Sequence, residues 1–260
     1  MHFLMWLLIA LQICAPLGVS ADEAKLTVGF IAALSGPAQA YGEAARNGFE
    51  LARNKAQDPS VRVIYEDDQF IPAKTVTAFN KLTQLDSVDV IISVGSATLN
   101  AIAPLAEAKN IPVIGWASDP QASRNRRFVI RSYPSGEKEG KRAGEESQKR
   151  GFSKVGIITA IHDYAASWRS GILDVLPSSS LLMEEQVPPD MHDFRSLLTK
   201  ARQKGVEDFV VCLLPGQVGL FAKQSFQMGM KPKIGGCEFL QDENEAKIAN
   251  GALTGAWYLE

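Results

Sequence analysis

The sequence has little cysteine, with 3 in 260 residues, which is too few for a scaffold built on disulfides. It also lacks a strong net charge, because 27 basic residues against 29 acidic ones leave a formal charge of −2. No overall positive field therefore exists to hold nucleic acid or an anionic membrane surface. Since 46% of the residues are apolar and 22% charged, the composition is that of a folded chain. Its partners must be recognised by a local site.

Long hydrophobic runs are missing as well, apart from a short one at the start of the chain. Residues 3–11 are all apolar, and Val19 and Ala21 are the small residues of a cleavage site. This run is shorter than the roughly 20 residues that cross a bilayer, so we expect residues 1–21 to be a secretory signal peptide. Because the start has no Lys or Arg, an uncleaved anchor or a lipid attached at Cys14 stays an alternative.

From residue 26 onward, β-rich apolar runs alternate with amphipathic helical stretches. This alternation predicts the α/β class, with parallel sheets covered on both faces. Two helices are the clearest: one begins at Pro72, and one begins at Asp193 as N-cap and ends near Gly205. The expected strands are 26–33, 61–66, 88–94, 112–115, 128–132, 154–160, 181–187, 208–213, 233–236 and 253–259.

The alternation is interrupted once, by a polar stretch without period at residues 117–127. A new strand and a fresh series of strands and helices follow it. We therefore expect a domain crossing there, with a first lobe at 22–120 and a second at 121–255.

Candidate site residues follow the strands, because ligands of open parallel sheets bind beyond the carboxyl ends of the strands. Ser96 stands where a strand runs into a helix, whose amino terminus favours a carboxylate; capping of its own helix by Ser96 or Thr98 is the alternative. Glu238 lies on the opposite side of the expected cleft, where a carboxylate would pair with an ammonium group. The full set of candidates is Tyr41, Ser96, Ala117, Ser118, Asp119, Asp163, Tyr164 and Glu238.

Enzyme chemistry has little support in the sequence. No Gly-x-Ser-x-Gly nucleophile elbow occurs, and Ala33-Leu34-Ser35-Gly36-Pro37 stands where a dinucleotide-binding glycine motif would follow the first strand. The chain beyond the signal peptide has two histidines, His162 and His192, which we interpret as surface loop residues, and no His/Cys cluster at metal-ligand spacing. We expect no enzyme activity, no metal and no cofactor.

The order of several motifs resembles the branched-chain amino-acid (leucine/isoleucine/valine) periplasmic binding proteins of ABC transporters, the type 1 family. The motifs that carry the resemblance are residues 28–37, Tyr41-Gly42, 65–68, 95–98, 117–120, Asp193-Phe194 and 236–238. The resemblance implies two doubly wound parallel-sheet lobes that close on an amino acid. Family members continue for about another hundred residues that complete the first lobe, so the first lobe is expected to be incomplete, with residues 256–260 starting the crossing back.

The resemblance also implies a role for each candidate. Ser96 and Asp119 would hold the α-carboxylate and α-amino groups of the ligand, Ala117 would act through its backbone, and Glu238 would receive the ammonium. Asp119 departs from the family, in which a threonine is common, and this places a negative charge near the ligand. Tyr41 would contact the ligand side chain, and the Asp163-Tyr164 pair would close the other wall.

The resemblance further implies a periplasmic solute-binding protein, with no membrane insertion after signal cleavage and no nucleic acid. It would take an amino acid, of the branched-chain type first, and deliver it to an inner-membrane ABC permease. A sensor of the same fold, or a transport component for amides or urea, is the alternative. Cys212 and Cys237 both fall at strand ends of the second lobe, where we expect two free thiols, with an oxidised pair as the alternative.

Overall fold

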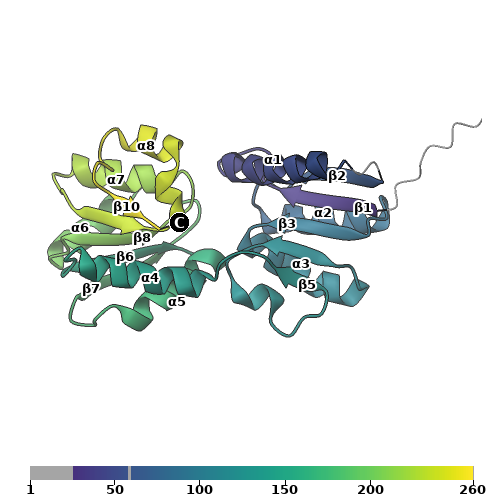
Figure 1. Ribbon diagram of the computed structural model, residues 1–260. Helices are drawn as coiled ribbons and strands as arrows, with labels where there is room; N and C mark the ends of the chain where they lie inside the picture. The colour runs from purple at the N-terminus through teal and green to yellow at the C-terminus, as the bar shows by residue number, and fades with distance from the viewer. Residues whose placement is uncertain (1–25, 58–59, 260) are drawn as a thin grey trace, which may run out of the picture.

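The computed structural model describes residues 26–57 and 60–259, which form two α/β lobes side by side (Figure 1). The expected signal peptide, with Cys14, lies outside the described residues. The first lobe contains β1 (Leu26–Ala32), α1 (Gln39–Ala56), β2 (Val61–Asp67), α2 (Pro72–Gln84), β3 (Val90–Val94), α3 (Ser96–Lys109), β4 (Val113–Trp116), the short 3-10 helix η1 (Pro120–Ser123) and β5 (Val129–Arg131).

The second lobe follows without a return to the first. It contains α4 (Gly136–Lys149), β6 (Val155–Ala160), α5 (Asp163–Val175), β7 (Leu181–Val187), α6 (Arg195–Gln203), β8 (Asp208–Cys212), α7 (Val218–Gln227), β9 (Lys233–Gly236), the 3-10 helix η2 (Glu238–Gln241), α8 (Glu243–Ala249) and β10 (Trp257–Tyr258). All ten expected strands are present, with bounds that differ by a few residues.

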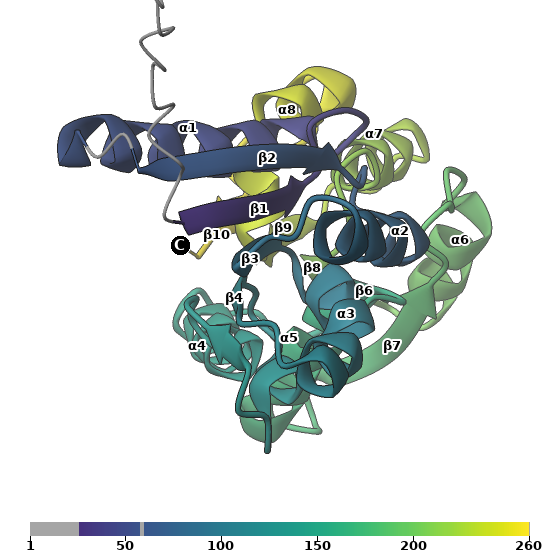
Figure 2. The ribbon, with the colours of Figure 1, turned by 90° about the vertical axis from the view of Figure 1, so that its right-hand side faces the viewer.

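Both sheets are parallel and have the same strand order. The first sheet runs β2-β1-β3-β4-β5, and the second, read from its other edge, runs β7-β6-β8-β9-β10. Helix α1 packs on one face of the first sheet, with Phe49 against Phe30, while α2 and α3 cover the other face (Figure 2). This is the doubly wound arrangement, and it confirms the predicted fold class.

Local chemistry explains where the predicted helices begin. Helix α2 has Pro72 in its first turn and buries Thr75, Phe79 and Leu82 on one stripe. Helix α6 begins two residues after Asp193, whose carboxylate accepts a hydrogen bond from the backbone N–H of Arg195 at 3.0 Å. Asp193 therefore stabilises the first turn of α6, although it lies one position before the N-cap and not at the N-cap as predicted.

The predicted lobe boundaries at 120/121 and 255/256 are wrong. Strand β5 pairs with β4 in the register Val113↔Val129, so the first sheet continues to Arg131 and the crossing lies between β5 and α4. The polar stretch that suggested a crossing folds instead as η1 and a turn between two strands of one sheet. At the other end, Trp257 pairs with Gly235, so β10 is the edge strand of the second sheet. The indole of Trp257 occupies the space that a side chain at Gly235 would fill.

Helices α4 and α5 pack backbone against backbone. A Cβ added at Gly140 would lie 1.8 Å from the carbonyl oxygen of Trp168, and one added at Gly171 would lie 1.9 Å from that of Glu137. Such distances are impossible without a shift of one helix. The contact therefore fixes the position of α5 against α4, and with it the position of the residues at the start of α5.

We predict that Gly171→Ala lowers the free energy of unfolding by about 1–3 kcal/mol or more, because the methyl group forces the two helices apart. Gly48→Ala on α1 is the control, since a Cβ there meets nothing within 4 Å and should stabilise the helix by about 0.5–1 kcal/mol. Chemical denaturation of both variants checks this. Equal effects of the two substitutions would contradict the close packing.

Candidate functional site

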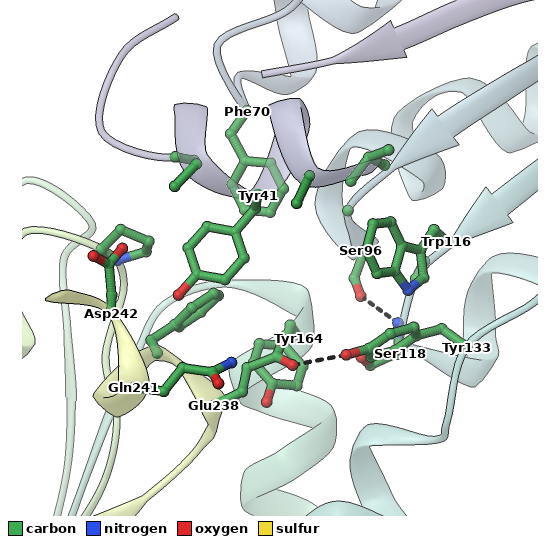
Figure 3. Close-up of a pocket in the computed structure, with 18 of the residues that line it drawn as sticks. Tyr41, Phe70, Ser96, Trp116, Ser118, Tyr133, Tyr164, Glu238, Gln241 and Asp242 are labelled. Atoms are coloured by element: carbon green, nitrogen blue, oxygen red, sulfur yellow. Dashed lines mark hydrogen bonds between the residues drawn. The ribbon is translucent and has the colours of Figure 1, made fainter. Parts of the chain in front are cut away.

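A cavity of about 530 Å³ lies between the two lobes, at the carboxyl ends of the strands (Figure 3). This volume is in the range of sites for small molecules. The residues that line it are Ala38, Ala40, Tyr41, Ala44, Phe70, Val94, Gly95, Ser96, Trp116, Ala117, Ser118, Tyr133, Tyr164, Pro215, Glu238, Phe239, Gln241, Asp242, Glu243 and Asn244. Six of the eight predicted site residues are among them, and Asp119 and Asp163 are not.

The first lobe contributes the amino terminus of α3. The hydroxyl oxygen of Ser96 accepts hydrogen bonds from the backbone N–H groups of Ser118 and Asp119, at 3.0 and 3.1 Å. Ser96 therefore does not cap its own helix, and its hydroxyl hydrogen remains available to the cavity. Thr98 instead donates to the carbonyl oxygen of Val94 at 2.7 Å and takes no part in the lining.

Gly95 permits this junction because no other residue fits there. Its φ is +108°, and a Cβ would lie 2.3 Å from a ring carbon of Phe70. Phe70 itself has a φ of +63°, which is uncommon for a bulky side chain. The fully buried carboxylate of Asp68 holds it there, accepting the Phe70 N–H at 2.9 Å and the Thr75 hydroxyl at 2.9 Å.

The carboxylate of Asp119 is engaged by groups outside the cavity lining, so a role of Asp119 at the ligand would fall to its main-chain atoms. One oxygen accepts the backbone N–H of Gln121 at 2.9 Å and caps η1, and the other accepts the side-chain amide of Asn100 at 2.7 Å. Asp119 thus supports the site through its backbone N–H, which is bonded to Ser96. The negative charge of Asp119, which was expected near the ligand, is therefore directed away from the cavity.

The second lobe contributes two half-buried carboxylates, Glu238 in the lining and Glu139 beside it. Tyr133 donates its hydroxyl to Glu238 at 2.7 Å, and Tyr164 donates its hydroxyl to Glu139 at 3.0 Å. Burial raises the pKa of both carboxyls, and that of Glu139 reaches about 7. Glu139 was not among the predicted residues, because it lies on the polar helix α4, where nothing in the sequence distinguishes it from its neighbours.

Asp163 and His162 join the two lobes beside the cavity. The Asn100 amide of the first lobe donates to Asp163 at 2.6 Å, and the ring of Phe70 stacks on His162 with centroids 5.4 Å apart. His162 also accepts the backbone N–H of Tyr164 at 3.3 Å and caps α5. The interpretation of His162 as a surface loop residue is therefore wrong, and burial lowers its pKa.

Aromatic rings dominate the walls of the cavity. Tyr41 meets Phe239 edge to face at 5.1 Å, and Trp116 meets Tyr133 in the same way at 5.4 Å. Tyr41 comes from α1 of the first lobe but packs against the core of the second. Of the rings that line the cavity, the sequence singled out Tyr41 and Tyr164 for the site. Trp168, further along α5, is fully buried in the core of the second lobe.

The remaining expectations concern metals, membranes and thiols. Within residues 26–57 and 60–259, no group of His, Cys, Asp and Glu is arranged to hold a metal ion. Over the same residues, each helix is too short or too polar to cross a membrane. Cys212 and Cys237 are both buried as free thiols.

The raised pKa of Glu139 predicts how stability depends on pH. The unfolded chain loses this proton near the ordinary value of 4.5, whereas the folded protein keeps it up to about 7. The free energy of unfolding of the ligand-free protein should therefore fall as pH rises from about 4.5 to about 7. In Glu139→Gln the fall should be smaller, as melting curves over this range would show. Glu145→Gln, exposed on the same helix, is the control, and identical profiles of the two variants would contradict the assignment.

The sequence and the fold are similar to those of known proteins. Residues 25–259 match the model of the family described as periplasmic binding protein. The Leu/Ile/Val-binding protein homolog 3 of Brucella melitensis biotype 1 is 26% identical over 254 residues, which cover 91% of this chain and 67% of that protein.

Two solved structures share the fold. The branched-chain amino acid transporter substrate-binding protein LivJ of Streptococcus pneumoniae, in complex with isoleucine, has a TM-score of 0.81 and 21% identity over 90% of this chain and 70% of its own. An ABC transporter solute-binding protein of R. palustris, in complex with 4-hydroxybenzoate, has a TM-score of 0.79 and 18% identity over 87% of this chain and 65% of its own. The chain thus spans about two thirds of the length of these relatives. Because the family match extends over the lobes and the cavity just described, the chain belongs to the periplasmic binding protein family.

Proposed function

We propose that this chain is the solute-binding component of an ABC transporter and that it captures an amino acid between its lobes. The observation that carries the proposal is the placement of two opposite partners around one cavity. The amino terminus of α3, with Ser96, favours a carboxylate, and the half-buried carboxylate of Glu238 favours an ammonium group. A zwitterion with both groups on one carbon satisfies both ends.

Location and delivery follow from this proposal. The family match supports a periplasmic protein that hands its ligand to an inner-membrane ABC permease. The Asn100–Asp163 and Phe70–His162 contacts are those that would form when the lobes close on a ligand. A sensor that uses the same closure, or a protein for amides or urea, remains the alternative that the sequence left open.

An aromatic acid is a second candidate, because six of the lining residues are aromatic and one relative is solved with 4-hydroxybenzoate. Charge disfavours it here. Among the described residues that line the cavity none is Lys, Arg or His, while Glu238 adds a half-buried carboxylate. An acid without an amino group would offer Glu238 no partner, and the two negative charges would share one small cavity.

The deciding experiment is calorimetry on the chain with a panel of amino acids, each paired with its deaminated analogue, and with 4-hydroxybenzoate. We expect at least one amino acid to bind, and its deaminated analogue, such as 4-methylpentanoate for leucine, to bind about tenfold more weakly or worse. Tighter binding of 4-hydroxybenzoate than of every amino acid would favour the second candidate instead.

Glu238→Gln tests the ammonium partner directly. The substitution keeps an acceptor for the Tyr133 hydroxyl but removes the charge, so amino-acid affinity should fall by about tenfold or more. The melting temperature of the ligand-free variant should stay close to that of the parent or rise slightly, because the lost carboxylate is partly desolvated and has no ion-pair partner among the described residues. Unchanged affinity would remove Glu238 from the ligand site.

A further inference from the structure

The cavity has a second polar end, away from Ser96, whose lining includes Tyr41 and Asp242. Asp242 precedes α8, and one of its carboxylate oxygens accepts the backbone N–H of Asn244 at 2.7 Å as an N-cap. The other oxygen has no hydrogen-bond or ion-pair partner among the described residues. Asp242 therefore brings to the cavity a charge that the fold itself does not use.

The hydroxyl of Tyr41 is also unmatched. Its oxygen is buried and has no hydrogen-bond partner among the described residues. Figure 3 shows it pointing toward the end of the cavity formed by Gln241 and Asp242. Burial and the negative charge of Asp242 both raise the pKa of Tyr41, in keeping with the presence of both residues in the lining of the cavity. A buried hydroxyl without a partner is costly, so an occupant that reaches it is expected.

The charges around the cavity do not balance for an aliphatic amino acid. The described lining residues include the carboxylates of Glu238, Asp242 and Glu243 and no cationic side chain. The α-ammonium group of an aliphatic amino acid would pair with Glu238 alone and leave the other two carboxylates without a cation. A leucine side chain would place hydrocarbon against the Tyr41 hydroxyl and the open oxygen of Asp242, and would satisfy neither.

We propose that the occupant is a basic amino acid, whose side-chain ammonium or guanidinium group lies between the Tyr41 hydroxyl and the Asp242 carboxylate. This inference rests on the proposed function and replaces the branched aliphatic side chain expected from the sequence. The group donates hydrogen bonds to both oxygens. The rings of Tyr41 and Phe239, in contact at 5.1 Å, provide apolar surface for the methylene stem and a π-face for the cation.

Calorimetry with paired amino acids tests the proposal: arginine against citrulline, and lysine against norleucine, with leucine alongside. Citrulline keeps the shape of arginine without its charge, and norleucine keeps the four-carbon stem of lysine without the terminal ammonium group. We expect the basic member to bind about tenfold more tightly or better, because it alone pairs with Asp242.

Asp242→Asn identifies the residue responsible. Asparagine is as good an N-cap as aspartate, so α8 keeps its first turn while the charge is lost. The advantage of arginine over citrulline should fall by about tenfold, and the affinity for citrulline should change little. Asp190→Asn, an exposed position of the second lobe outside the lining, loses the same charge and should leave the advantage intact. Tyr41→Phe should weaken arginine by several-fold, with the ring retained.

The outcomes separate the two proposals. If leucine or norleucine binds as tightly as lysine, or if Asp242→Asn and Asp190→Asn behave alike, the basic side chain is wrong and amino-acid capture still stands. If no amino acid of the panel binds, the proposed function fails, and the basic-ligand inference fails with it. Melting curves of each variant establish that it is folded.

Discussion

The site depends on a half-buried carboxylate that pairs with no cation among the described residues. Glu238 lies in the cavity with the Tyr133 hydroxyl as its hydrogen-bond partner, and burial raises its pKa. Leaving a charge in such a place costs stability unless an opposite charge arrives. The cost is compensated when a ligand supplies that charge, which makes the empty site unfavourable and the occupied one favourable. The second carboxylate behind it, Glu139, strengthens the same bias.

The positions of the functional side chains follow from strand order. All strands of each sheet are parallel, so the residues after β1, β3, β6 and β9 lie at the carboxyl-end edges of the two sheets, and the strand order of each sheet reverses beside β1 or β6. Tyr41, Ser96, Tyr164 and Glu238 follow these four strands, and all four line the cavity. Because apolar strand runs and the turns after them are visible in the sequence, this part of the site was predictable.

The parts that sequence reasoning missed depend on contacts between distant segments. Asp119 has the right position in the chain, but its carboxylate turns to Asn100 and the start of η1. Phe70 reaches the cavity because buried Asp68 holds its backbone at a positive φ. The hydrophobic periodicity of the sequence does not predict this backbone geometry. The lobe boundary was misplaced for a related reason: the polar stretch 117–127 shows a break in pattern, but pairing between β4 and β5 decides which sheet continues.

Ring contacts that bridge the lobes have a kinetic consequence. Tyr41 against Phe239 and Phe70 against His162 each join one lobe to the other beside the cavity. If the protein captures a ligand as proposed, both pairs separate when the lobes open to release it. Its residence time is then set by how often the protein opens as well as by its own polar contacts. Two ligands of unequal affinity would consequently differ less in departure rate than their equilibrium constants suggest.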